Sequence, residues 1–347
     1  MHITGPEEKC FTSARFSFDG LSEWLPPAVR ETWEKDSVVI RHPFEEHQIF
    51  SVGVLKGRIQ VTLRLHSELK SAKSEQARIS RTVPYVEVES EQPESLKWYR
   101  ELGNRLENVF SLLVGSSLAI ATMFVYCDKE SGRVIEKRHR HRTPFQPFDC
   151  VRCSPSQMAS AVSIWLSEGD GFRSVENLAL GVLRKGRLFV ETEFLSLSQA
   201  LEGFHRATTK VESPSHDAFI RTKTLIADLL RAEDLPPDLS ARILSAIEFA
   251  DEPSFAARLR NLCERVENEL LIKMNISRKV FIREIVDTRN LYTHAGSDTR
   301  KPPTGLADLF LLNQKMKALL RGVLLLHLGL TQEQISGLVI REATRWQ

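Results

Sequence analysis

The chain has 347 residues, of which 42% are hydrophobic and 27% charged, and its formal net charge is +2. This length exceeds that of one ordinary domain, so the composition predicts a globular protein of two domains. The nearly neutral charge argues neither for nor against nucleic acid as a ligand. No apolar stretch approaches the roughly 18 residues that cross a bilayer. The start lacks a basic-then-apolar signal pattern, so a cytoplasmic location is expected.

The first half predicts strands around one long helix. Apolar residues at 59, 61, 63 and 65 alternate with polar ones, which is typical of a half-buried strand. Residues 48–52, followed by Lys56-Gly57, predict its hairpin partner and the turn. Residues 85–89 and 120–126 are predicted as further strands. Between them, residues 96–113 have helical periodicity, with an apolar face of Trp98, Leu102, Leu106, Val109, Phe110 and Leu113.

A basic run and a cysteine pair follow these strands. In the run 137–142, Arg138, Arg140 and Arg142 are secondary candidates for RNA binding through backbone phosphates, and the alternative is a solvated hairpin. Cys150 and Cys153 form a lone C-x-x-C without the second pair of ligands that zinc needs. Free thiols are therefore favoured over a metal site, and the sequence calls for no cofactor.

From Phe194 onward the pattern is almost wholly helical. Helices are predicted near 194–207, 218–232, 238–249, 254–273, 278–295 and 305–328. Helices joined by short connections pack up and down into a bundle. The predicted fold class is thus α+β, with a mixed strand and helix domain over residues 1–190 and an all-α helical domain over residues 191–347.

The stretch Arg289-Asn290-Leu291-Tyr292-Thr293-His294 ends the helix predicted at 278–295. Arginine can hold a phosphate at two positions, histidine can transfer a proton near neutral pH, and asparagine can fix an orientation. Ala295-Gly296 provides a helix stop, which places His294 in the last turn, where the helix dipole favours its protonated form. The spacing alone leaves an alternative open. In this alternative, Arg289 is a surface residue and His294 is a helix-end residue bound to backbone carbonyls.

Several segments of the second half resemble one family. Residues 286–294 are similar to the V-D-T-R-N-x-x-x-H signature of the ApeA-like HEPN ribonucleases, which are abortive infection proteins. Residues 254–262 resemble their F-x-x-R-L-x-x-L segment, residues 194–206 the helix that joins their two domains, and residues 328–335 their ending. The resemblance covers roughly residues 191–340. Members usually carry more strand-rich chain ahead of Phe16, so the chain is expected to be either a shorter variant or one that lacks part of the N-terminal domain.

The resemblance implies a metal-independent endoribonuclease in anti-phage defence, with tRNA as a substrate and a homodimer formed through the C-terminal helical domain. Arg289, Asn290 and His294 would be catalytic. His294 would move the proton of an RNA 2′-hydroxyl, which DNA lacks, and Arg289 would hold the phosphorane. Two alternatives remain. One is a non-catalytic HEPN module that binds nucleotides or RNA and dimerises, and the other is a protein that only dimerises.

Four other residues are weaker candidates. Tyr292 can stack on a base, although an aromatic residue in a helix is more often part of the core. Glu202, His205 and Arg258 can assist the site, although each is more simply explained as an exposed or helix-packing polar residue. The N-terminal domain is the natural place for sensing or restraint.

Overall fold

The structure is a computed structural model. It describes residues 7–21, 30–34, 37–41, 48–54, 57–71, 78–127, 130–134, 150–151, 153–184, 188–209, 216–233, 235–248, 250–293 and 305–345. Within these ranges, none of the helices has the length and hydropathy that a bilayer span requires.

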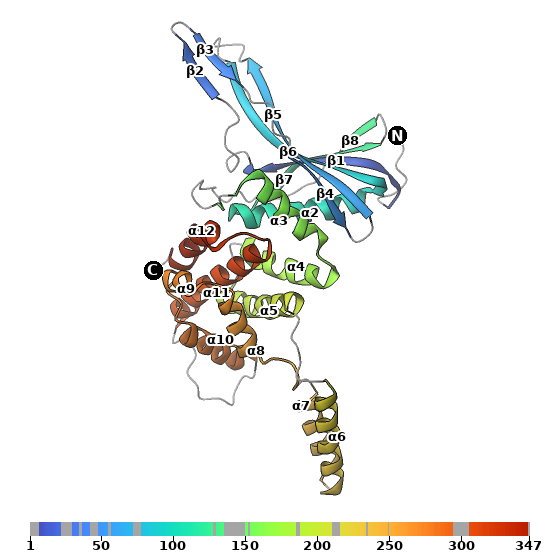
Figure 1. Ribbon diagram of the computed structural model, residues 1–347, viewed down its shortest axis with the longest axis vertical. Helices are drawn as coiled ribbons and strands as arrows, with labels where there is room; N and C mark the ends of the chain where they lie inside the picture. The colour runs from blue at the N-terminus through green and yellow to red at the C-terminus, as the bar shows by residue number, and fades with distance from the viewer. Residues whose placement is uncertain are drawn as a thin grey trace.

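An antiparallel sheet and its covering helix α2 form the upper part of the molecule in Figure 1. The strand order is β4-β5-β6-β1-β7-β8, and β2 pairs with β3 in a separate ribbon. The bounds are β1 (Lys9–Asp19), β2 (Arg30–Glu34), β3 (Ser37–Arg41), β4 (Gln48–Val54), β5 (Gly57–Ser71), β6 (Arg78–Ser95), β7 (Ala119–Cys127) and β8 (Glu130–Val134).

Helix α2 (Leu96–Val114) lies close against the sheet because Gly103 allows it. A Cβ at Gly103 would lie 2.6 Å from Cε1 of Phe16 in β1, which is closer than two carbon atoms can approach. Phe16 is fully buried, and Ser95 caps the start of the helix by accepting a hydrogen bond from the backbone N–H of Trp98. The sheet face and the apolar face of α2 therefore share one tightly packed layer.

Helices make up the remainder. They are α3 (Pro155–Ser167), α4 (Asp170–Arg184), α5 (Val190–Thr208), α6 (His216–Ala232), α7 (Pro237–Ala246), α8 (Phe255–Glu264), α9 (Asn268–Lys273), α10 (Arg278–Thr293), α11 (Leu306–His327) and α12 (Gln332–Thr344). Helix α11 is buried along most of its length and packs against α5 and α12. Helices α6 and α7 project from the bundle as a hairpin at the lower end of Figure 1.

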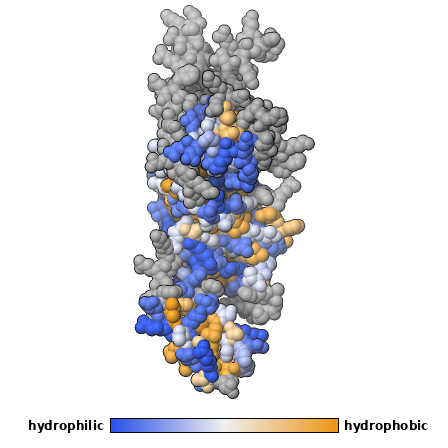
Figure 2. Space-filling view, turned by 90° about the vertical axis from the view of Figure 1, so that its right-hand side faces the viewer, coloured by the Kyte–Doolittle hydropathy of each residue, from blue (hydrophilic) through white to orange (hydrophobic). Residues whose placement is uncertain are grey.

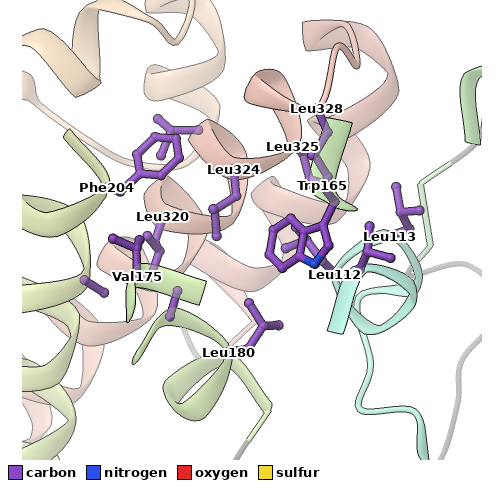
Figure 3. Packing of buried hydrophobic residues seen from close by; sticks show 14 of the residues in the cluster. Leu112, Leu113, Trp165, Val175, Leu180, Phe204, Leu320, Leu324, Leu325 and Leu328 are labelled. Carbon is purple, nitrogen blue, oxygen red and sulfur yellow. The ribbon is translucent and has the colours of Figure 1, made fainter. Parts of the chain in front are cut away.

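One hydrophobic cluster joins the sheet part to the bundle. Figure 3 shows Leu112 and Leu113 of α2 next to Trp165 of α3, with leucines of α11 on the other side of the indole. Val175 and Leu180 of α4 and Phe204 of α5 continue the same packing. The two parts of the molecule thus share a core instead of being joined by a bare linker.

The α+β fold class is confirmed, as are the predicted strands at 48–52, 59–65, 85–89 and 120–126 and the helix at 96–113. The single helix predicted over 254–273 is wrong. Helix α8 ends in two backbone hydrogen bonds that each span three residues, from the N–H of Arg265 to the carbonyl of Leu262 and from the N–H of Val266 to the carbonyl of Cys263. Helix α9 then starts after Glu267. This break turns Val266 into the core, where it is 2% exposed.

Three helices, α3, α4 and α12, were not predicted from the sequence. Helices α3 and α4 fall inside the predicted first domain, yet α4 packs against α5 of the bundle. The division at residues 190 and 191 stays a prediction. The helix predicted to reach residue 295 is described to Thr293, so His294 lies outside the described residues, as do Arg138, Arg140 and Arg142.

Candidate functional site

Helix α10 carries the predicted motif and packs against α5 and α8. Its buried residues are Phe281, Ile282, Ile285 and Thr288. Arg289 and Asn290 follow directly on Thr288 and are both half-buried. The motif therefore begins where the buried face of the helix meets solvent, which is a position from which a side chain can reach both the protein and a ligand.

Two neighbouring helices hold the guanidinium of Arg289. Its Nη2 atom donates a hydrogen bond to Oε2 of Glu202 in α5 at 2.9 Å. Its Cζ atom lies 4.4 Å from the ring centre of Phe255 in α8, which is a cation–π contact. The side chain of Arg289 is still 31% exposed. A charge fixed from two sides and open on a third is well suited to bind an anion.

The same glutamate connects Arg289 to a chain of alternating charges. Arg206 lies 3.3 Å from Oε1 of Glu202 and 3.0 Å from Oε2 of Glu252. Arg258, which is 3% exposed, lies 2.6 Å from the same Oε2 atom of Glu252. Three guanidinium groups face two carboxylates, so the cluster carries an excess of one positive charge. This excess favours an anionic ligand such as a phosphate.

His205 lies at the buried end of this series of charged side chains. It is fully buried, its Nδ1 atom lies 3.4 Å from Nη1 of Arg258, and its Nε2 atom lies 3.4 Å from the side-chain amide of Asn261. Burial, with the charges of Arg258 and Arg265, lowers the pKa of His205 to about 4. Because a guanidinium only donates, Nδ1 accepts from Arg258 and the neutral ring carries its proton on Nε2, which requires Asn261 to turn its side-chain oxygen, and not its NH2 group, toward Nε2. His205 is thus a neutral packing residue and not a proton donor at neutral pH.

The remaining predicted residues are placed as follows. Tyr292 is 38% exposed, and its ring centre lies 6.0 Å from that of Phe194 in a tilted arrangement, so part of its face is covered by α5. Burial raises the pKa of the Tyr292 hydroxyl, with a smaller contribution from Glu191. Thr293, the last residue of α10, donates from Oγ1 to the carbonyl of Arg289 at 2.8 Å. In sequence, His294 follows it directly.

Of the other three weaker candidates, the structure brings Glu202 and Arg258 into the cluster of alternating charges and buries His205 beside them. Sequence reasoning did not single out Phe255 as a partner of Arg289, because an aromatic residue at a helix start is most simply explained as core. It named Glu202, 87 residues before Arg289, as a weaker candidate but did not predict its contact with Arg289.

A polar cleft lies elsewhere, between α2 and α4. Its volume is about 390 Å³, and its lining includes Trp98, Arg105, Arg173 and Glu176. Arg105 and Glu176 already bind each other there. The part of the chain that the structure describes contains no cluster of three metal-ligating side chains. Burial raises the pKa of Cys153 to about 11, so its thiol is protonated at neutral pH.

Two family models match the chain. Residues 195–334 match the model described as Apea-like HEPN, and residues 1–151 match ApeA N-terminal domain 1. The chain is an ApeA-like HEPN protein. This family suggests a HEPN-domain protein of abortive infection and defence. Comparison with curated proteins and with solved structures gave no match.

The two matches fall on different parts of this ApeA-like HEPN protein. The N-terminal match takes in the sheet and α2, and the HEPN match takes in Arg289 together with its supports Glu202 and Phe255. Helices α3 and α4 lie in the gap between the matches. Every contact that fixes the Arg289 guanidinium therefore comes from within the HEPN match.

Proposed function

We propose that this chain is a metal-independent endoribonuclease whose catalytic residues are Arg289, Asn290 and His294. The observation that carries the proposal is the support of Arg289: Glu202 and Phe255 fix its guanidinium at the edge of α10, and the chain reaches His294 five residues later. A fixed, partly exposed cation beside a histidine is the minimum that general acid–base cleavage of RNA requires.

The proposed reaction is a transesterification within the RNA. His294 takes the proton of a 2′-hydroxyl, and the 2′-oxygen attacks the adjacent phosphorus. The bond from phosphorus to the 5′-oxygen breaks, and a proton from an acid completes the leaving 5′-hydroxyl. Arg289 stabilises the additional negative charge of the phosphorane, and Asn290 orients the phosphate or His294. The products are a 2′,3′-cyclic phosphate end and a 5′-hydroxyl end.

This reaction needs an acid as well as a base, and one motif offers one histidine. A two-fold dimer through the C-terminal helical region supplies the second, because an isologous interface doubles every group near its axis. We therefore propose a homodimer in which two copies of His294 serve one cleft.

The proposed substrate is RNA, and tRNA in particular, within an anti-phage defence that stops translation. The excess positive charge around Arg289 and Arg206 supports an anionic polymer as ligand. The exposed part of Tyr292 is available to a base. We further propose that Arg138, Arg140 and Arg142 add phosphate contacts without taking part in the chemistry.

The test compares Arg289→Ala and His294→Ala with Arg260→Ala on total RNA in the presence of EDTA. Arg260 is an exposed arginine of α8 and controls for the loss of one positive charge. We expect the first two variants to lose cleavage by about 10²–10³-fold while Arg260→Ala stays near wild type. The fragment ends are to be analysed for the cyclic phosphate, which identifies the mechanism independently of the rate.

Full cleavage by both Arg289→Ala and His294→Ala would overturn the catalytic assignment. RNA binding without cleavage by the wild-type protein would favour the non-catalytic binding module instead. Absence of both binding and cleavage would leave dimerisation as the role of the bundle.

A further inference from the structure

The α6–α7 hairpin, residues 216–248, lacks the burial that normally stabilises a pair of helices. Helix α7 has no buried residue, and Leu225 and Leu229 of α6 are 60% and 55% exposed. Ile220 and Leu239, in the same hairpin, are also exposed. Figure 1 shows the hairpin projecting away from the bundle, and Figure 2 shows hydrophobic surface among the polar residues of this lower end. Two short helices with such an apolar surface are expected to be covered by a partner.

Helix α6 has two stripes of mainly apolar residues, and one of them packs against α7. The covered stripe consists of Phe219, Lys223, Ile226 and Leu230, all half-buried, and Lys223 also forms an ion pair with Glu248 at 2.6 Å. The second stripe, which we call the open stripe, consists of Ala218, Thr222, Leu225, Leu229 and Ala232. Every residue of the open stripe is exposed.

The spacing of the open stripe indicates what kind of surface it fits. Its residues follow one another at intervals of four, three, four and three, which is the repeat of a helix that packs lengthwise against another helix. The hydroxyl of Thr222 donates to the carbonyl of Ala218 at 2.9 Å, so its polar group is already satisfied within the helix. The open stripe therefore fits a helix that lies along α6.

We propose that this helix is α6 of a second copy of the chain, in antiparallel orientation. Centred on Leu225, the stripe reads nearly the same in both directions, with Ala218 and Ala232 at its two ends. An antiparallel two-fold pair thus sets Leu225 against Leu225 of the partner subunit and a small residue opposite a small residue at either end. Such an interface is isologous and closes on itself.

The charges of α6 select the same arrangement. The first half carries Arg221 and Lys223 against Asp217, and Lys223 is paired with Glu248 on the covered side. The second half carries Asp228 and, just beyond the helix, Glu233 against Arg231, which pairs with Asp228 within the helix. An antiparallel pair sets the positive half of one helix beside the negative half of the other, and Arg221 next to Asp228 of the partner subunit. A parallel pair would set like charges together.

Charge also argues against the other occupants. Residues 216–248 contain six acidic and four basic residues, a net charge of −2. A polyanion such as RNA, or an anionic lipid surface, requires an excess of positive charge. The open stripe thus fits a protein helix of mixed charge, which α6 itself provides.

This interface is separate from the one at which two copies of His294 would meet. Helix α6 has 17 residues and is about 25 Å long at the usual rise per residue. Antiparallel pairing puts the two bundles at opposite ends of that length. The pairing therefore adds a second contact to the assembly, and its test does not depend on RNA cleavage.

The experiment measures the molar mass of the full chain by sedimentation. Leu225→Asp with Leu229→Asp should raise the dissociation constant of the pair by at least about 100-fold, because two buried leucines are replaced by charges, and so halve the mass. Ile272→Asp on α9 is the matched control, since Ile272 is 61% exposed. It should keep the wild-type mass. A double variant with the wild-type mass, or a control with the same loss, would overturn the proposal.

A charge swap gives a second measurement that does not alter the leucines. Arg221→Asp should weaken the pair by about tenfold, and the addition of Asp228→Arg in the same chain should restore it. Hydrogen exchange on the wild-type protein should show that protection of residues 216–232 rises with protein concentration. Absence of both the rescue and the concentration dependence would contradict the pairing, whatever happens to cleavage.

Discussion

Two of the arginine and glutamate clusters among the described residues differ in how fully the hydrogen-bond donors of their arginines are satisfied. Between α2 and α4, Arg184 binds Glu107, Asn108 and the carbonyl of Leu118, and Arg105 binds Glu176 and the carbonyls of Trp165 and Leu166. Both glutamates are less than 10% exposed. Almost every donor is directed at the protein itself, so this cluster fixes the position of α4 against the sheet part.

At α10 the arrangement is more open. Glu202 holds Arg289 by one hydrogen bond, Phe255 covers one face of the guanidinium, and 31% of the side chain is exposed. The contrast shows that residue types alone do not separate a structural cluster from a candidate site. What separates them is the number of donors left for a ligand.

The largest expected difference between the clusters is in stability. Arg184→Met leaves Glu107 buried without its cation, and we expect the free energy of unfolding to fall by about 3 kcal/mol. Arg289→Met should cost about 1 kcal/mol or less, because its ion pair is partly exposed. Urea denaturation of both variants checks this. Equal losses would mean that the α10 cluster is also structural.

The second expected effect is a dependence of stability on pH at the buried end of the α10 cluster. The pKa of His205 is lowered to about 4 in the folded protein. The folded protein therefore keeps His205 neutral down to about pH 4, whereas the unfolded chain protonates it below about pH 6.5. Stability should thus fall as the pH falls from about 6.5 to 4, and level off below that.

His205→Gln removes this contribution and leaves every other titrating group in place. Between pH 7 and pH 4.5 the wild-type protein should lose about 2 kcal/mol more than the variant does. The measurement is urea unfolding at the two pH values. An equal loss of unfolding free energy in both proteins would show that the pKa of His205 is not lowered in the folded state.

The smallest expected effect concerns Glu202, and it rests on the proposed ribonuclease activity. Glu202→Gln keeps an oxygen for Arg289 and removes the charge that competes with phosphate, so KM should fall about threefold with little change in kcat. Glu202→Ala removes the support, so kcat should fall about tenfold. Steady-state kinetics on a single RNA separates these outcomes. Identical behaviour of the two variants would exclude a positioning role.

The sequence predicts elements well where the apolar pattern is regular. Helices α2, α5, α10 and α11 follow from it, as does β5. Strand β1 escaped prediction because its register shifts between Lys9, Phe11 and Ser13, which interrupts the alternation of its buried side chains. Helix α4 escaped prediction because a charged residue, Glu176, lies on its buried face. Arg105 and Asn108 of α2 donate hydrogen bonds to Glu176, which allows the carboxylate to be buried.

The sequence does not indicate the break between α8 and α9, because no glycine or proline lies there and Val266 continues the apolar spacing through it. For the candidate site, the sequence indicates the motif on α10 but not its support. Local spacing relates residues of one helix, whereas the contacts from Glu202 and Phe255 to Arg289 depend on how three helices pack.

The hairpin is attached in a way that has an evolutionary consequence. Arg206, near the end of α5, and Glu252, just before α8, form an ion pair at 3.0 Å, so the chain leaves and re-enters the bundle at neighbouring points. Residues 216–248 therefore lie between two neighbouring points of the bundle, so changes in their length and sequence can leave the helices that carry Arg289 in place. With the pairing of α6 proposed above, two related chains that differ in this segment would no longer pair with each other, although the helices around Arg289 are the same in both.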